Sequence, residues 1–314
     1  MALLEVKDLK VHFPVRGGFF GTVKSHIKAV DGISFKIDEK ETLGLIGESG
    51  SGKSTTGKAI IGLSHITSGQ ILYKGQDITK QVKHNRSPFR KDVQMIFQDA
   101  YSSLNPRKRV LDILAEPLRN FEKLSKAEEE KRVHELLDIV GMPKSALAKY
   151  PFEFSGGQRQ RIGVARSVAL KPKLIIADEP VSALDISIQA QVLNYLKDIQ
   201  QEMGIAYLFI SHDLGVVKHM CENLVIMHNS RFVEKGTRQD IYRNPTHIYT
   251  KKLIAAIPNL DPSKKEESFL KRAEILKEYD TKYLEYYKEN GYVYDLQKIS
   301  ETHFVAMPSS VGKE

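Results

Sequence analysis

The chain has 314 residues, of which 41% are apolar, 27% charged and 8% aromatic. At roughly 150 residues per domain this length predicts about two compact units, and the composition excludes disorder along the whole chain. The longest apolar stretch, Met203–Ile210, is far shorter than the roughly 17–25 residues of a membrane-spanning helix. We therefore expect a globular protein that does not cross a membrane.

The 47 basic and 39 acidic side chains give a formal net charge of +8. The excess lies before Asp261, because the nine basic and eleven acidic residues from there to the end sum to −2. A basic body suits nucleic acid, anionic lipid or a nucleotide polyphosphate, and composition does not choose among them. The single cysteine, Cys221, excludes an intrachain disulfide and any metal site built from several cysteines of this chain. Because the start of the chain also lacks a signal-peptide pattern, we expect a cytosolic protein.

Alternating apolar and polar residues at the start predict a first strand, followed by an exposed loop over Pro14–Thr22, which is rich in Gly and Pro. Further along, three short apolar runs predict strands buried on both faces of a parallel sheet. They are Leu43–Ile46, Leu174–Ala177 and Tyr207–Ile210. Apolar residues at helical spacing from Ile188 to Met203 predict a helix between the last two. The core is therefore expected to be α/β.

Residues 99–169 carry helix signals and little strand signal. Ser125 and Glu128 form a capping box that opens a helix, and Gly141 ends it with Pro143 beyond. We expect a helical subdomain inserted in the α/β core.

The chain becomes polar after Pro258, and six of its 13 tyrosines fall between Tyr279 and Tyr294. Four of them follow helical spacing, which predicts a packing face on a helix. We expect a partly helical C-terminal extension with a mobile tip.

A glycine-rich turn follows the first buried strand and precedes the helix-compatible segment Thr55–Leu63. It fits G-x-x-x-x-G-K-[ST] with Gly47, Glu48, Ser49, Gly50, Ser51, Gly52, Lys53 and Ser54. In this pattern backbone N–H groups surround the β-phosphate of a nucleotide, the lysine reaches the β and γ oxygens, and the serine ligates Mg²⁺. The turn predicts a nucleotide-binding P-loop.

Two carboxylates, Asp178 and Glu179, end the buried strand that begins at Leu174. Ligands of α/β sheets collect at the carboxyl ends of the strands. Asp178 is expected to help hold Mg²⁺, directly or through water, and Glu179 to accept a proton from an attacking water. Without the P-loop, the same pair would be read as a strand end with a helix-capping acid.

A second phosphate-binding helix N-terminus is predicted at Ser155, Gly156, Gly157 and Gln158, ahead of the helix-compatible stretch Ile162–Leu170. One nucleotide does not need two such sites, so we expect the second to serve a nucleotide held by another subunit. Gln98 and His212 also follow predicted strands, although each alone is more often structural.

These five elements occur in one order over about residues 3–257, and there the chain resembles the ATP-binding subunits of ABC transporters. The resemblance implies an α/β fold with a RecA-like P-loop NTPase core, an N-terminal antiparallel β subdomain, the inserted helical subdomain at 99–169 and a C-terminal extension. It divides the chain into a nucleotide-binding domain at 1–258 and an extension at 259–314, whose features begin at about residue 240.

The resemblance also assigns roles to individual residues. ATP would be held by Gly47 to Thr55 of the Walker A loop, by Phe13 stacked on adenine and, across a subunit interface, by Ser155 to Gln158 of the signature. Mg²⁺ would be held by three residues, namely Ser54, Gln98 and Asp178. Catalysis would rest on three, namely Glu179 as the base, Gln98 of the Q-loop and the switch histidine His212.

Closer resemblance is to the oligopeptide and dipeptide permease branch. It rests on the long loop after Phe13, the run Phe97–Arg107 after the Q-loop glutamine and the segment Asn244–Thr250. This implies a peptide importer in which ATP hydrolysis moves a membrane permease, at the cytoplasmic face of the cell membrane. The implied partners are a second, non-identical OppD-like ATP-binding subunit, two transmembrane permease subunits and, indirectly, an extracytoplasmic peptide-binding protein. The chain would touch the membrane only through partners, bind no nucleic acid, and hydrolyse ATP without the segment beyond Asp261.

Two alternatives stay open. Importers of nickel and other small solutes share this branch. A soluble ABC ATPase that acts on nucleic acid or ribosomes would use a basic face made of Lys80, Lys83, Arg86, Arg90 and Lys91.

Overall fold

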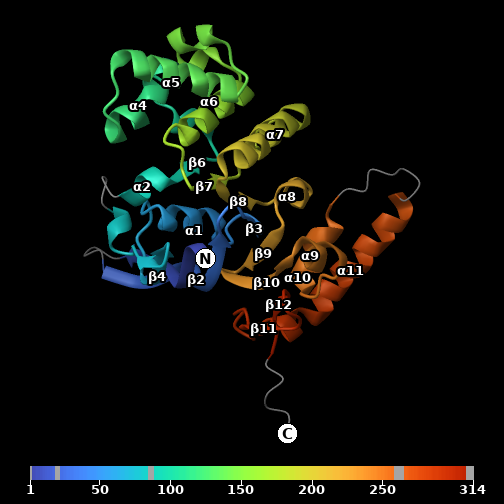
Figure 1. Cartoon of the computed structure of the whole chain (residues 1–314). Helices are drawn as coiled ribbons and strands as arrows, with labels where there is room; N and C mark the ends of the chain where they lie inside the picture. Colours follow the sequence, from blue (N-terminus) through green and yellow to red (C-terminus); the bar gives the residue numbers. More distant parts are fainter. Residues whose placement is uncertain (1, 18–21, 84–87, 258–264, 309–314) are drawn as a thin grey trace.

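The computed structural model describes residues 2–17, 22–83, 88–257 and 265–308. Within them the strands form two sheets (Figure 1), one of four strands in the order β2-β1-β4-β5 and one of eight in the order β11-β12-β10-β9-β3-β8-β7-β6. Residues 309–314, at the end of the chain where a mobile tip is predicted, lie outside the described residues.

The centre of the larger sheet is parallel. Its five parallel strands are β9 (Asn223–His228), β3 (Thr42–Ile46), β8 (Ala206–Ser211), β7 (Leu174–Asp178) and β6 (Val93–Ile96). Every residue of β3, β7 and β8 is buried, which confirms the three strands predicted from apolar runs. Side chains alternate between two cores: Leu174 and Ile176 pack toward the smaller sheet, and Ile175 and Ala177 toward the helices.

The smaller sheet is antiparallel and contains β1 (Ala2–Gly17), β2 (Thr22–Asp38), β4 (Ser68–Tyr73) and β5 (Gln76–Asp77). The predicted loop over Pro14–Thr22 is wrong at both ends, because Pro14–Gly17 extends β1 and Thr22 begins β2. Residues 18–21 lie outside the described part. Pro14 is tolerated in the hairpin because β1 pairs with β4 only as far as Lys10, so that beyond this point one edge of β1 is open.

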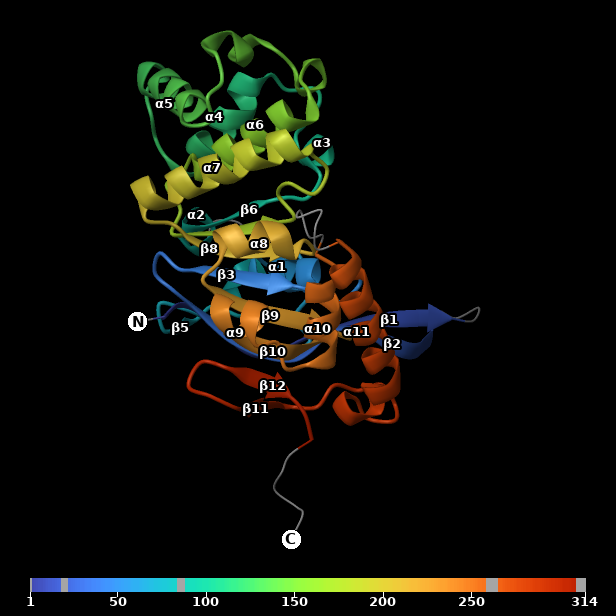
Figure 2. The same cartoon turned by 90° about the vertical axis from the view of Figure 1, so that its right-hand side faces the viewer.

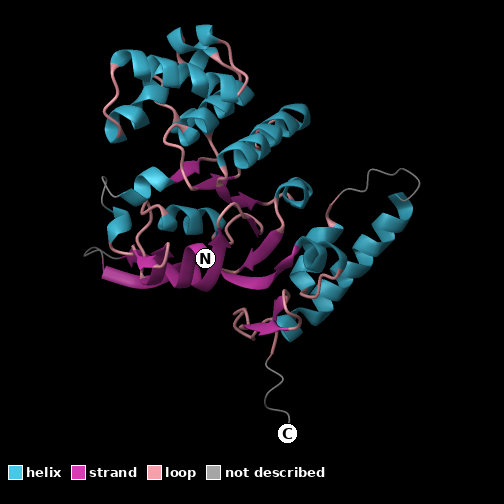
Figure 3. Cartoon of the chain, viewed as in Figure 1, coloured by secondary structure: helices cyan, strands magenta, loops and turns pink. Residues whose placement is uncertain are grey.

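The upper end of the molecule contains helices and loops without strands (Figure 3), and residues 99–169 contain helices and no strand, as the sequence predicts. Its helices are α3 (Ala100–Ser103), α4 (Val110–Phe121), α5 (Lys126–Ile139) and α6 (Gly156–Val168), with 3₁₀ turns η2 (Lys144–Ala148) and η3 (Pro151–Glu153). The capping box of Ser125 and Glu128 is present at the start of α5, and Gly141 follows with a φ of 62°.

The remaining helices surround the central sheet. They are α1 (Lys53–Ile60), α2 (Pro88–Asp92), α7 (Ile186–Met203), α8 (Leu214–Met220), α9 (Arg238–Arg243), α10 (Ile248–Ala255) and α11 (Lys265–Tyr286), with a 3₁₀ turn η1 (Gln81–Lys83). The predicted helix from Ile188 to Met203 is α7. Tyr279, Tyr283 and Tyr286 of α11 pack against the core and Tyr287 is fully buried, so the predicted tyrosine packing face is confirmed.

The C-terminal segment joins the larger sheet. β12 (Phe304–Ala306) pairs antiparallel with β10 (Arg231–Thr237), and β11 (Leu296–Lys298) pairs with β12. Figure 2 shows β3, β9, β10, β12 and β11 in this order across the sheet. The division of the chain at residue 258 stays a prediction, but the extension shares both a sheet and a core with the residues before it.

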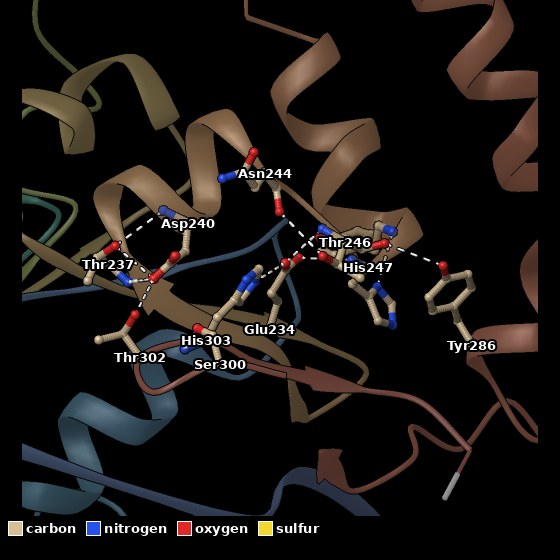
Figure 4. A network of polar contacts seen from close by, with 11 residues as sticks. Glu234, Thr237, Asp240, Asn244, Thr246, His247, Tyr286, Ser300, Thr302 and His303 are labelled. Carbon is tan, nitrogen blue, oxygen red and sulfur yellow. Dashed lines mark hydrogen bonds and ion pairs between the residues drawn. The ribbon is translucent and has the colours of Figure 1, made fainter. Parts of the chain in front are cut away.

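A buried carboxylate fixes this junction (Figure 4). Glu234 of β10 is fully buried and accepts hydrogen bonds from the backbone N–H groups of Thr246, at 2.8 Å, and His247, at 3.1 Å. His303, between β11 and β12, brings Nε2 within 2.6 Å of the same carboxylate. Burial raises the pKa of Glu234, and these hydrogen bonds oppose the shift. The pair therefore holds the C-terminal strands and the start of α10 to β10.

We predict that His303→Ala lowers the free energy of unfolding by about 3 kcal/mol, because it removes one partner of a buried pair. Urea denaturation checks this. Thr302→Ala, which removes only an exposed hydroxyl bonded to Asp240 at 2.9 Å, should cost below about 1 kcal/mol. Adding Glu234→Gln to His303→Ala should recover part of the loss, because an amide is cheaper to bury than a carboxylate. Equal losses at His303 and Thr302 would contradict the prediction.

Candidate active site

Most of the predicted site residues meet at one edge of the larger sheet, and the exceptions are Phe13 and the signature. The Walker A loop follows β3, Gln98 follows β6, Asp178 and Glu179 lie at the end of β7, and His212 follows β8. These four strands are parallel neighbours, so their carboxyl ends meet at the same edge.

Hydrogen bonds connect these residues directly. The Ser54 hydroxyl donates to Asp178 Oδ1 at 2.7 Å, and Gln98 Nε2 donates to Glu179 Oε2 at 2.7 Å. His212 Nδ1 lies 3.1 Å from the other oxygen, Glu179 Oε1. The structure therefore brings together residues that are up to 158 positions apart in the sequence, from Ser54 to His212.

The Walker A loop is built around its glycines and its lysine. Gly52 has a φ of 109°, and a Cβ there would lie 2.1 Å from the carbonyl oxygen of Ala29. Gly50 has a φ of 83°, but a Cβ there would meet open space. Lys53 begins α1, is buried, and donates from Nζ to the carbonyl oxygen of Glu48 at 2.9 Å. Burial lowers the pKa of Lys53, while the charges of Glu179, Asp178 and Glu48 act in the opposite direction.

The two carboxylates have different surroundings. Asp178 is buried, which raises its pKa, and the hydrogen bond from Ser54 opposes this shift. Glu179 has a φ of 47°, a left-handed conformation that non-glycine residues rarely adopt. Its backbone N–H donates to the carbonyl oxygen of Ile210 at 2.9 Å, which helps to hold this conformation. The Glu179 carboxylate is thereby fixed between the side chains of Gln98 and His212.

The oxygen atoms of Ser54 and Asp178 are hard ligands that suit Mg²⁺. In the described part of the chain, no group of three or more His, Cys, Asp or Glu side chains is arranged to hold a metal. Magnesium commonly takes one or two protein ligands and completes its shell with water and substrate phosphates, so the residues present fit it. The Ser51 hydroxyl of the same loop is buried and has no partner among the described residues.

The signature stands apart from this cluster. Ser155 is the N-cap of α6 and forms a capping box with Gln158, in which Ser155 N–H donates to Gln158 Oε1 at 3.0 Å. A Cβ at Gly157 would lie 2.5 Å from Ile188 of α7, which explains the need for glycine there. Figure 1 places α6 in the helical subdomain and α1 against the central sheet. None of the contacts described for Ser155 or Gln158 reaches the Walker A loop of the same chain.

Phe13 lies on β1 opposite Ile27 and is 42% exposed. It takes part in none of the contacts described above.

Sequence reasoning missed Tyr249 of α10, whose hydroxyl oxygen accepts a hydrogen bond from the backbone N–H of Glu48 at 3.0 Å. The only signal for Tyr249 in the sequence was its place in Asn244–Thr250. That segment supports the resemblance to the oligopeptide and dipeptide permease branch, but no function was assigned to its residues.

Comparison with family models gives two matches. A model described as "ABC transporter" matches residues 30–182, and a model described as "Oligopeptide/dipeptide transporter, C-terminal region" matches residues 233–282. The second match begins in β10, which carries Glu234, and ends within α11 after Tyr279, so the other three tyrosines of the packing face and His303 lie beyond it.

Curated relatives match along nearly the whole chain. The oligopeptide transport ATP-binding protein OppF of Lactococcus lactis subsp. lactis (strain IL1403) is 58% identical over 98% of this chain and 96% of its own length. The protein of the same name from Bacillus subtilis (strain 168) is 46% identical over 96% of this chain and 95% of its own length.

Solved structures show the same fold. A dimeric post-hydrolysis state of the ATP-binding cassette MJ0796 bound to ADP and Pi has a TM-score of 0.65 at 25% identity, covering 75% of this chain and 98% of the other. The structure of cbiO1 from Clostridium perfringens, part of the cbiONQ ABC transporter complex, has a TM-score of 0.65 at 25% identity over 86% and 98%. The fold class expected from the sequence is confirmed.

We predict that Gly52→Ala lowers the free energy of unfolding by about 3 kcal/mol or more, since it adds a steric clash to an unfavourable φ. Gly50→Ala is the matched control, because it meets the φ penalty alone and should cost about 1–2 kcal/mol. Chemical denaturation without nucleotide measures both. Similar losses in the two variants would show that the contact with Ala29 does not determine the need for Gly52.

Proposed function

Because this chain belongs to the family of ABC transporter ATP-binding proteins, we propose that it binds and hydrolyses ATP to power the import of oligopeptides. The observation that carries the proposal is the Glu179 carboxylate, held by Gln98 and His212 beside the Ser54–Asp178 pair and the Walker A loop. Support for the peptide substrate comes from the names of the relatives and from the match to the C-terminal region model.

ATP binding is assigned to the Walker A loop. Backbone N–H groups from Gly50 to Ser54 would surround the β-phosphate at the start of α1, and Lys53 would exchange the carbonyl of Glu48 for phosphate oxygens. The glycine-lined space at Gly50 is open enough for a phosphate to approach the backbone. Phe13 would stack its exposed ring on adenine.

Mg²⁺ would be held by Ser54, Asp178 and Gln98 and would neutralise charge on the β- and γ-phosphates. Glu179 would accept a proton from a water molecule while the oxygen of that water forms a bond to the γ-phosphorus. The bond from that phosphorus to the β-γ bridging oxygen then breaks, and ADP leaves with the electron pair. Gln98 and His212 position the Glu179 carboxylate before the reaction.

The signature is assigned to a nucleotide held by a second ATP-binding subunit. The start of α6 offers a helix N-terminus for phosphate, yet its described contacts are with Gln158 and with α7 rather than with its own Walker A loop. A similar cassette forms a dimer. In the proposed transporter the second subunit is OppD-like and not identical to this chain.

A cavity of about 760 Å³ between β6 and the helical subdomain supports docking of a transmembrane permease subunit. Its lining includes Phe97, which precedes Gln98, together with Arg119 of α4 and Arg166 of α6. A permease segment seated here would sense movement of Gln98 against the helical subdomain. Among the helices that the structure describes, none combines the length and apolar character needed to cross a membrane. The full assembly would contain two permease subunits and receive peptides from an extracytoplasmic binding protein, with this chain at the cytoplasmic face.

The alternative of a nucleic-acid-binding face has little support. Lys91 pairs with Glu122 at 3.2 Å and Arg90 donates to the carbonyl oxygen of Val82 at 3.0 Å, so these cations have protein partners. Arg86 lies outside the described residues. The reported relatives are named for oligopeptide transport, which favours peptides over nickel or other small solutes.

We predict that Glu179→Gln lowers the ATP turnover rate of the assembled transporter by about 100- to 10,000-fold, because an amide does not accept the proton. The dissociation constant for Mg-ATP should stay within about twofold of the parental value. Glu202→Gln is the control, since it makes the same chemical change on the exposed side of α7. Phosphate release and equilibrium binding measure the two quantities. A parental rate in Glu179→Gln would remove Glu179 as the base.

We predict that Ser155→Arg blocks ATP turnover in the assembled transporter, because a long cation at the N-cap of α6 fills the space for the partner's nucleotide. Cross-linking of labelled ATP should show weaker labelling of the partner subunit, with labelling of this chain retained. Ser155→Thr keeps the N-cap oxygen and should retain most activity. The opposite labelling pattern would contradict the shared site.

A further inference from the structure

The Walker A loop touches the C-terminal part of the chain at Glu48. The backbone N–H of Glu48 donates to Tyr249 Oη at 3.0 Å, and Lys252 Nζ lies 3.7 Å from Glu48 Oε1. Both partners belong to α10. One helix therefore holds the backbone and the side chain of the same loop residue.

Glu48 also contacts Lys53, the lysine of the loop. The carbonyl oxygen of Glu48 accepts the hydrogen bond from Lys53 Nζ at 2.9 Å. Tyr249 thus lies two hydrogen bonds away from the ammonium group that is assigned to the phosphates, and a shift of the Glu48 backbone would move the acceptor that orients this group.

Aromatic packing fixes Tyr249 in turn. Its ring is fully buried and stacks on His228 with centroids 4.0 Å apart at 25°. His228 Nδ1 lies 2.7 Å from the hydroxyl of Tyr287, just beyond α11. Burial lowers the pKa of His228 to about 4, so the ring is neutral at pH 7 and packs as an uncharged plane. Tyr283 stacks on Tyr287 at 4.2 Å and 11°.

The start of α10 is fixed separately. The Glu234 carboxylate binds the backbone N–H groups of Thr246 and His247 and contacts His303 near the C-terminal strand (Figure 4). Two residues beyond Asp261 therefore reach the surroundings of Tyr249, Tyr287 through His228 and His303 through Glu234.

We propose that Tyr249 is a positioning residue for nucleotide binding, which holds the Glu48 backbone so that Lys53 points to the phosphates, and that the C-terminal segment acts on the ATP site through Tyr287, His228 and Tyr249. This inference rests on the proposed ATP site. The expectation that hydrolysis does not need the segment beyond Asp261 stays a prediction, and the present proposal concerns the affinity for ATP.

Tyr249→Phe tests the hydroxyl alone, because phenylalanine keeps the ring that stacks on His228. Loss of the acceptor for the Glu48 N–H should raise the dissociation constant for Mg-ATP about 5- to 10-fold, measured by calorimetry on the full chain. In the assembled transporter KM for ATP should rise while kcat changes by less than about twofold, since Glu179 is untouched. Tyr287→Phe should weaken binding in the same direction but less.

Tyr286→Phe is the matched control. It removes a hydroxyl that donates to the carbonyl oxygen of Thr246 at 3.4 Å, in the same region but without contact to the Walker A loop. Its affinity for Mg-ATP should stay within about twofold of the parental value. Melting temperatures measured without nucleotide identify any variant that fails to fold. If Tyr249→Phe does not fold, the comparison of Tyr287→Phe with Tyr286→Phe decides.

Parental affinity in a folded Tyr249→Phe, an equal loss in Tyr286→Phe, or equal falls in kcat and kcat/KM would overturn the positioning role. Lys53→Ala separates this result from a failure of the proposed function. If Lys53→Ala binds Mg-ATP as well as the parent, the ATP site itself is wrongly assigned. If Lys53→Ala loses binding while Tyr249→Phe keeps it, only the role of Tyr249 is lost.

Discussion

The parallel pairing of β3, β8 and β7 is the constraint on which the site depends. In this register Ile46 lies opposite Ser211, and Ile210 lies opposite Asp178. The Walker A loop, Asp178 and His212 consequently leave the sheet at nearly the same level, although they come from three separate parts of the sequence. A slip of one residue would turn Asp178 to the other face of the sheet, so burial of the strands on both faces protects the geometry of the site.

Several features of the site lower the stability of the folded chain, and packing elsewhere in the fold offsets this cost. Lys53 and Asp178 are ionisable groups that are buried. Burial lowers the pKa of Lys53 and raises that of Asp178, so it favours the neutral form of each. Glu179 also has a left-handed backbone conformation. Opposite charges close to Lys53 and the hydrogen bonds at Glu179 offset part of this cost. The two cores on either face of the central strands supply the remaining stability. Groups fixed in advance in this way stabilise the charge that develops during the reaction, at some cost to the stability of the free protein.

Local patterns predicted the parts of the structure that local interactions determine. The buried runs became β3, β7 and β8, the capping box opened α5, and the glycine-rich pattern that ends at Lys53 and Ser54 correctly placed a turn before α1. Long-range pairings were not predictable in this way. The Tyr249–Glu48 hydrogen bond joins residues 201 positions apart, and β12 joins the sheet through only three residues. Pro14–Gly17 was misread because Gly and Pro usually break strands, whereas an open edge tolerates them.

The place of the C-terminal segment follows from the sheet itself. β10 would expose an unpaired edge if β12 did not pair with it, and an open edge invites association with other chains. The chain that returns to cover this edge passes α11 and Tyr287 on the way, and it carries His303 to Glu234. Glu234 and His228 lie on the paired strands β10 and β9, so covering the edge also orders the two residues that hold α10. Protection of the sheet and support of the Walker A loop are therefore served by the same C-terminal segment, and a change in how it packs would reach Glu48 through the contacts of Tyr287, His228 and Tyr249.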